Sequence, residues 1–160
     1  MEVSKSTRIY AVFVVIILLI AILGYTYYAD AEAIQNVFAE VNTINNISPK
    51  ITSATLTFSL NVTNPSQRDI TDLSSIFDIF ISQTKIGEGS FAGLSVPAQS
   101  NVFKEVTITV YYSGLADSII NIFENWKQGQ DTTLIVDGIM EATVLFGLAT
   151  ASHEFIATSQ

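Results

Sequence analysis

The stretch IYAVFVVIILLIAILGYTYY, residues Ile9 to Tyr28, divides this chain into two unlike parts. It carries no charged residue, and at a helical rise of about 1.5 Å per residue it is long enough to cross the ~30 Å hydrocarbon core of a bilayer. We therefore expect residues 9–28 to form a transmembrane helix that contacts the lipid bilayer. Tyr10 at one edge and Tyr25, Tyr27 and Tyr28 at the other are typical of the aromatic residues that anchor such helices at both interfaces.

The charges beside this run predict its orientation. Lys5 and Arg8 precede it, whereas the first charges after it are acidic and no basic residue follows until Lys50. Because basic flanks stay on the cytoplasmic side, we expect residues 1–8 to be a cytoplasmic tail, with Arg8 as an interface anchor, and the remainder to be extracytoplasmic. A cleavable signal peptide is the alternative, since Ala29-Asp30-Ala31 is a small-x-small site, but the apolar run is longer than such a peptide usually carries.

Length and composition limit what lies beyond the anchor. The chain has 160 residues, a net charge of -8 and no cysteine. Residues 50–160 amount to about 110 positions, a common size for a single domain. The few Lys and Arg residues are scattered singly, so no basic patch is available to neutralise phosphates, and nucleic acid is not expected as a partner. Without cysteine, disulfides and thiolate metal sites are excluded.

Residues 29–49 are predicted to be a helical stalk or linker. Ile34, Val37, Phe38, Val41 and Ile44 recur at helical spacing and form one apolar stripe on a polar segment. The membrane helix is therefore expected to continue outward before the chain reaches Pro49, which disfavours helix in the residue before it.

From Ile51 onward the apolar period changes from helical to alternating, which is typical of half-buried strands. We predict strands over 56–62, 76–82, 85–91 and 106–112, a helix over 115–126 with Trp126 in the core, and β-rich segments over 132–136, 139–146 and 148–155. Turns are predicted at Asn64-Pro65-Ser66-Gln67, at Asp137-Gly138 and at Gly147. The fold class is mainly β: an immunoglobulin- or fibronectin III-like β-sandwich with one packed helix, preceded by the transmembrane helix.

The order of several short motifs resembles a known family. Leu60-Asn61-Val62-Thr63-Asn64-Pro65-Ser66, Lys85-Ile86-Gly87-Glu88-Gly89, Val96-Pro97-Ala98-Gln99-Ser100 and Val106-Thr107-Ile108-Thr109-Val110 occur in this order. Together they resemble the water-stress and hypersensitive-response (WHy) domain of group 2 late embryogenesis abundant (LEA2) proteins, over about residues 51–155. The resemblance implies a β-sandwich, a membrane anchor in some members, and stress-associated, largely non-enzymatic roles with no catalytic residues. Ser66 stands where the family often has a second Asn.

Features that resemble chemical sites lack the residues needed to complete them. His153 is the only histidine, and its nearest carboxylates do not match a usual metal-ligand spacing. Asp69, Asp72 and Asp78 cluster around an expected turn without the alternating ligands of a calcium loop. We therefore expect no catalytic, cofactor-binding or metal site, and the chain is not expected to be an enzyme.

The glycine-rich segment after residue 86 is likewise not expected to bind phosphate. Gly87-x-Gly89 and Gly93 are followed by Leu94-Ser95-Val96-Pro97, which cannot open the helix that a phosphate loop requires. A β-bulge or strand-end loop is the better interpretation. Ser90 in Gly89-Ser90-Phe91-Ala92-Gly93 does not match the nucleophile elbow of hydrolases.

Two N-glycosylation sequons, at Asn46 and Asn61, lie on the side predicted to be extracytoplasmic. The leading functional hypothesis is a membrane-anchored, extracytoplasmic β-sandwich with a non-enzymatic binding, scaffolding or stress-protective role in the envelope. Its expected partner is an unidentified protein, with self-association as one form. The alternatives are a pilin-like subunit of an extracellular filament and an accessory single-span subunit of a membrane complex.

Overall fold

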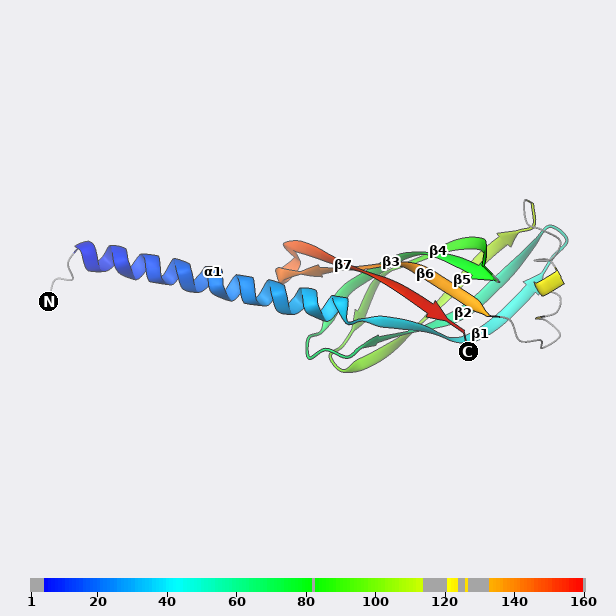
Figure 1. Cartoon of the computed structure of the whole chain (residues 1–160), viewed down its shortest axis with the longest axis horizontal. Helices are drawn as coiled ribbons and strands as arrows, with labels where there is room; N and C mark the ends of the chain where they lie inside the picture. Colours follow the sequence, from blue (N-terminus) through cyan, green and yellow to red (C-terminus); the bar gives the residue numbers. More distant parts are fainter. Residues whose placement is uncertain (1–4, 82, 114–120, 124–125, 127–132, 160) are drawn as a thin grey trace.

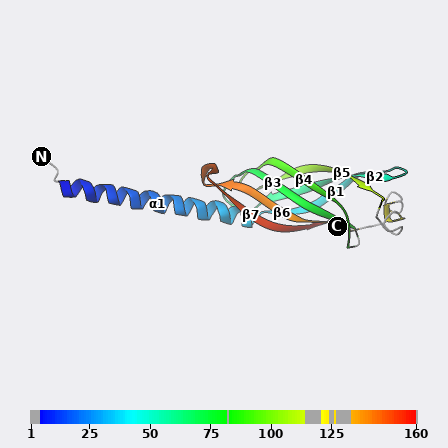
Figure 2. The ribbon, with the colours of Figure 1, turned by 90° about the horizontal axis from the view of Figure 1, so that it is seen from above.

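The computed structural model describes residues 5–81, 83–113, 121–123, 126 and 133–159, and the side chains of these residues from Ile9 onward. The elements in order are α1 (Lys5–Gln35), β1 (Phe38–Pro49), β2 (Ser53–Asn64), β3 (Ile70–Ile81), β4 (Thr84–Val96), β5 (Ser100–Tyr111), β6 (Leu134–Val144), the short 3-10 turn η1 (Leu145–Gly147) and β7 (Ala149–Thr158). Figure 1 shows α1 as a long rod that leaves one end of an elongated β domain, and Figure 2 shows the same arrangement from above.

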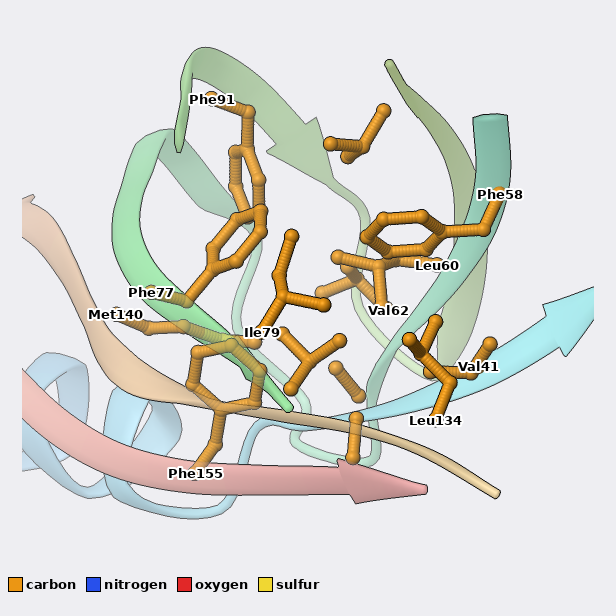
Figure 3. Close-up of a cluster of buried hydrophobic side chains, with 14 of the residues drawn as sticks. Val41, Phe58, Leu60, Val62, Phe77, Ile79, Phe91, Leu134, Met140 and Phe155 are labelled. Carbon is orange, nitrogen blue, oxygen red and sulfur yellow. The ribbon is translucent and has the colours of Figure 1, made fainter. Parts of the chain in front are cut away.

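The strands form two antiparallel sheets, as predicted for a sandwich. One sheet has the order β1-β2-β5 and the other β4-β3-β6-β7. Their apolar faces meet in the core, where Phe58 and Leu60 of β2 lie opposite Phe77 and Ile79 of β3 (Figure 3). Alternate positions of β2 are buried along its whole length, which confirms the alternation predicted from sequence.

Most predicted strands are confirmed, with longer bounds. The hairpin predicted from Ile76 to Phe91 is β3 paired with β4, although β3 begins earlier, at Ile70, and Ser82 lies outside the described residues. Of the helix predicted over 115–126, only residues 121–123 and 126 are described, and all of these are helical. Trp126 packs against the core, as predicted.

The prediction of a helical stalk over 29–49 is correct only for residues 29–35 and is wrong beyond them. The helix ends at Gln35, where the Asn36 side chain donates to the Glu32 carbonyl at 2.8 Å, and β1 begins at Phe38. Val37 and Val41 belong to the supposed helical stripe, yet they are four residues apart and fit an alternating pattern equally well. Pairing with the edge of β2 selects the strand, because it buries Val41 and satisfies the backbone of β2.

The predicted break at Asp137-Gly138 is also wrong, because β6 runs through it without interruption. Gly138 is required for close packing rather than for a turn: a Cβ atom here would lie 2.4 Å from the Phe77 Cβ and 2.5 Å from the Ile76 carbonyl oxygen. The predicted break at Gly147 is correct, since the chain turns there with φ +85°.

Candidate functional site

The N-terminal two thirds of α1 present an apolar surface with no protein around it. The segment Ile9–Gln35 is long and apolar enough to cross a membrane, and none of its most apolar window is buried by the rest of the protein. Tyr10, Tyr25, Tyr27 and Tyr28, the predicted interface anchors, are all exposed. The side chain of Arg8 lies outside the described part of the structure.

The last turns of α1 are part of the sandwich. Ala33 and Ile34 are 2% exposed, Val37 just after the helix is 1% exposed, and all three belong to the hydrophobic core. Asp30 joins the helix to two turns of the domain: one carboxylate oxygen lies 3.5 Å from Arg68 Nη1, and the other accepts a 3.1 Å hydrogen bond from the Leu145 N–H. This junction fixes the direction of α1 relative to the sheets.

In the sequence, Asp30 stands out only as an acidic residue after the apolar run and as the middle of the small-x-small site Ala29-Asp30-Ala31. The three groups that meet at the junction are separated by 38 and 115 positions along the chain, and nothing in the local pattern at Asp30 indicates such contacts. Their encounter is a consequence of sheet topology, because the β2–β3 and β6–β7 turns lie at the same end of the sandwich as α1 (Figure 1).

The Asn64 turn belongs to one of the motifs that resemble the family, and its hydrogen bonds join two turns of the domain. Asn64 is fully buried, and its Nδ2 donates to the carbonyls of Arg68 (2.7 Å), Val96 (3.1 Å) and Pro97 (3.2 Å). Its Oδ1 accepts hydrogen bonds from the Ser66 N–H at 3.0 Å and the Ser66 hydroxyl at 2.7 Å. The asparagine thus ties the β2–β3 turn to the β4–β5 turn, and Ser66 takes part fully in the network.

The two sequons occupy different environments. Asn46 is exposed on the edge strand β1. Asn61 is half-buried on the central strand β2, where its Oδ1 accepts a 2.7 Å hydrogen bond from Asn101 Nδ2. A glycan needs a free amide nitrogen and room around it, so the geometry is more open at Asn46.

The carboxylates suspected of calcium binding are separated by the strand geometry. Asp69 precedes β3 and accepts a 2.8 Å hydrogen bond from the Ala98 N–H, whereas Asp72 and Asp78 lie within β3 rather than at a turn. Asp78 is 2.9 Å from Lys85 Nζ, which also lies 2.7 Å from Glu88. Hydrogen bonds to Glu88 and Asp78 raise the pKa of the Lys85 ammonium group.

The other suspected chemical motifs are parts of strands. Gly87, Gly89, Ser90 and Gly93 all lie within β4, and the register with β3 shifts at the positive φ of Gly93, as expected for the predicted bulge. His153 is half-buried on β7 opposite Met140. Among the residues that the structure describes, no group of three His, Asp or Glu side chains is placed to hold a metal ion.

The outer faces of the two sheets carry different apolar residues. The β1-β2-β5 sheet presents hydroxyl groups, with Thr57 and Thr107 joined at 3.0 Å between their Oγ1 atoms, and also the exposed aromatic side chains of Phe103 and Tyr111 on β5. The β4-β3-β6-β7 sheet instead presents Ile76 and Ile139 as cross-strand neighbours, both exposed, with an exposed Ile156 on β7. We call these three residues the isoleucine patch. Carboxylates flank the patch on the same strands: Asp78, Asp137, Glu141 and Glu154.

No protein-family model and no curated protein matches this sequence. Among solved structures, a protein from Arabidopsis thaliana aligns over 76% of this chain and 73% of its own, with 18% identity and a TM-score of 0.46. A protein from Archaeoglobus fulgidus aligns over 78% of this chain and 92% of its own, with 16% identity and a TM-score of 0.41. A protein described as late embryogenesis abundant aligns over 98% of this chain and 87% of its own, with 10% identity and a TM-score of 0.43. Likenesses this distant assign no activity to the chain.

Proposed function

We propose that this chain is a single-pass membrane protein that holds a non-enzymatic binding or scaffolding domain at the outer surface of a bilayer. Residues 9–28 span the membrane, the N-terminus is cytoplasmic and the sandwich is extracytoplasmic. The observation that carries the proposal is the junction at α1: the exposed apolar helix ends in Ala33 and Ile34, which are core residues of the sandwich. Anchor and domain therefore move as one body, and the domain is displayed at a fixed distance from lipid.

Membership in the WHy domain family is part of this proposal. It is supported by the order of the motifs from Leu60 to Val110. It is also supported by Asn64, whose buried side chain donates hydrogen bonds to the Val96 and Pro97 carbonyls, which explains why an asparagine is needed at that turn. Membership implies a stress-protective role at the envelope.

The isoleucine patch is the surface that best suits a protein partner. Ile76 and Ile139 lie side by side on the outer face of a sheet, where apolar residues normally give way to polar ones. The surrounding carboxylates favour a partner with an apolar centre and a basic rim. Such a partner can be a second membrane protein, which retains the hypothesis of an accessory subunit.

The pilin-like alternative loses one of the two features that favoured it. Its general plan, a long apolar helix joined to a β-rich head, is retained, but it also relied on an apolar stripe that continues along one helix through Val41. In the structure Val41 is buried in the sandwich as part of β1, so that stripe is not available to another subunit.

Topology can be tested by cysteine labelling in intact cells, because the natural chain has no cysteine. A membrane-impermeant maleimide should label a Thr107→Cys variant, whose position is exposed on β5, without lysis. The matched Ser4→Cys variant in the tail should be labelled only after lysis. The reverse pattern, or release of the labelled domain from membranes by carbonate washing, would contradict the proposed anchoring.

The partner surface can be tested separately by photo-crosslinking. A crosslinking amino acid in place of Ile139 should give an adduct that Ile76→Glu abolishes, whereas the same amino acid in place of Thr57 should give none. Thr107→Glu on the other sheet is the matched control and should leave the Ile139 adduct intact. An adduct of twice the 17.4 kDa chain mass would identify self-association. Equal adducts from both sheets would refute the assignment of the patch.

A further inference from the structure

The turn between β6 and β7 is apolar, although it lies at the surface of the domain. It reads Leu145-Phe146-Gly147-Leu148, and no Asp, Glu, Lys or Arg lies between Glu141 and Glu154. Phe146 is 82% exposed and Leu148 is 79% exposed. Surface turns usually carry Gly, Pro, Asn, Asp or Ser, which satisfy the backbone or tolerate its conformation. Two large apolar side chains at a hairpin tip therefore point to a non-aqueous surrounding.

The backbone of this turn keeps an unfavourable conformation. Leu145 and Phe146 have φ values of +53° and +60°, in the left-handed region that residues other than glycine seldom adopt. The turn is tied to α1 by the hydrogen bond from the Leu145 N–H to Asp30, and it closes with a 3.2 Å bond from the Leu148 N–H to the Leu145 carbonyl. Such strain persists where the surroundings determine the conformation, and it is frequent at functional contacts.

The position of the turn along α1 gives its depth relative to the bilayer. Asp30, to which Leu145 is bonded, comes two residues after Tyr28, or about 3 Å further along the helix axis. The interfacial layer on each side of the hydrocarbon core is about 5 to 7 Å thick. When residues 9–28 fill the hydrocarbon core, the tip of the β6–β7 hairpin lies within this layer, beside the C-terminal part of α1 (Figures 1 and 2).

We propose that the β6–β7 tip is a second membrane contact, in which Phe146 and Leu148 insert among the lipid headgroups and upper acyl chains of the outer leaflet. The inference rests on the proposed function, because it requires α1 to span the bilayer. Tyr25, Tyr27 and Tyr28 are exposed on the adjoining stretch of helix, so the tip and the tyrosines form one interfacial surface. The two contacts fix the tilt of the sandwich and hence the direction in which its outer faces point.

Depth-dependent quenching can test this contact in the full chain reconstituted in phosphatidylcholine vesicles. An environment-sensitive fluorophore is attached to a Phe146→Cys variant, and the quencher is a phosphatidylcholine with a nitroxide near the top of its acyl chain. We expect a blue-shifted emission and quenching several-fold stronger than at Ile51→Cys. Ile51 is the matched control because it is a large apolar residue, 97% exposed, in the β1–β2 turn at the opposite end of the sandwich.

A third label separates the failure of this inference from the failure of the proposed function. In a Val15→Cys variant the fluorophore lies in the middle of the proposed span and should be quenched by a nitroxide deep in the acyl chain. If Val15→Cys is quenched while Phe146→Cys behaves like Ile51→Cys, the second contact is refuted and the anchor stands. If Val15→Cys is not quenched, the anchor itself is refuted.

The cooperation of the two side chains gives a further test. Adding Phe146→Ser to a labelled Leu148→Cys variant should lower its quenching by lipid, because one of the two inserted groups is lost. Emission that is blue-shifted at Phe146→Cys, insensitive to the lipid quencher and dependent on protein concentration would instead show that a second copy of the chain covers the tip, and would overturn the proposal.

Discussion

The two ends of the sandwich are closed by different means. We call the end from which α1 leaves the proximal end, and it contains the β2–β3, β4–β5 and β6–β7 turns. Side chains join these turns to one another: Asn64 bonds to the carbonyls of Val96 and Pro97, and Asp30 reaches both Arg68 and the Leu145 N–H. The opposite, distal end contains the β1–β2 and β3–β4 turns.

At the distal end, the bonds between the described residues come from the backbone, from surface ion pairs and from one side chain, Ser159, whose Oγ accepts a 2.9 Å hydrogen bond from the Leu134 N–H. The Lys50 N–H donates to the Ser53 carbonyl at 2.7 Å, and the Tyr112 N–H donates to the Thr52 carbonyl at 3.0 Å. Lys85 pairs with Asp78 and Glu88 on the exposed face nearby. The contrast indicates that hydrogen bonds between different turns are concentrated at the end from which α1 leaves. It predicts that substitutions at the proximal end cost more stability than those at the distal end.

The largest effect is expected from Asn64→Ala. It removes every hydrogen bond of the Asn64 amide from a buried turn and leaves carbonyl groups without donors, so we expect a loss of about 4 kcal/mol of unfolding free energy. Urea unfolding of the full chain in detergent micelles, followed by the fluorescence of the single Trp126, measures it. Asn61→Ala on the same strand, which loses one exposed hydrogen bond, is the control. Equal losses in the two variants would refute the special role of Asn64.

A somewhat smaller loss is expected from Ile34→Ala at the junction. Ile34 is 2% exposed, and truncation of a buried isoleucine costs about 3 kcal/mol. The same urea titration should show almost no change for Ile20→Ala, since Ile20 lies on the exposed part of α1 and contacts detergent rather than the core. If both variants leave the midpoint unchanged, the helix end does not belong to the folded domain.

Asp30→Ala should cost about 1 kcal/mol, because it removes one hydrogen bond and one partly exposed ion pair. Its more specific effect is on the β6–β7 tip, where a nitroxide at Phe146→Cys should gain mobility in electron paramagnetic resonance spectra. Glu32→Ala, two residues further along the helix, should leave that mobility unaltered. A tip that stays equally immobile without the Asp30 carboxylate would show that other contacts hold it.

The pH dependence at the distal end should be smaller still. The folded-state pKa of Lys85 is raised above 10.5 by its two carboxylate partners, so its stabilising contribution is complete below the unfolded pKa and is lost as pH rises through the folded pKa. The difference in urea midpoint between the natural chain and Lys85→Met should therefore shrink above pH 10.5 and in high salt. A difference that grows with pH would contradict this sign.

The smallest effect is expected from Ile51→Ser in the distal β1–β2 turn. Ile51 is 97% exposed, so its replacement should change the unfolding free energy by less than about 0.5 kcal/mol. The matched proximal change, Leu148→Ser, should be equally small in detergent but should reduce contact with lipid in vesicles. A large loss of stability from Ile51→Ser would remove the contrast between the two ends.

Strong local patterns explain which predictions from the sequence were correct. The alternation from Leu56 to Val62 is long and unambiguous, and it became the central strand β2. The segment around Val41 was wrongly predicted to be helical, because apolar residues four apart satisfy both the helical and the alternating period. Only pairing with the free edge of β2 selects the strand. Asp137-Gly138 has the composition of a turn. The close packing of Phe77 against Gly138 cannot be predicted from the residues next to Gly138, because the two residues are far apart in the chain.

Hydrophobic periodicity and composition are enough to predict that a helix with a long uncharged run precedes a β-rich domain without cysteine. They do not reveal where α1 ends, how Asp30 meets Arg68 and Leu145, or that Asn64 joins two turns. Each of these depends on groups far apart in the chain, and their meeting is set by the order of strands in the sheets. The position of the β6–β7 tip beside α1 belongs to the same class, since no local pattern encodes it.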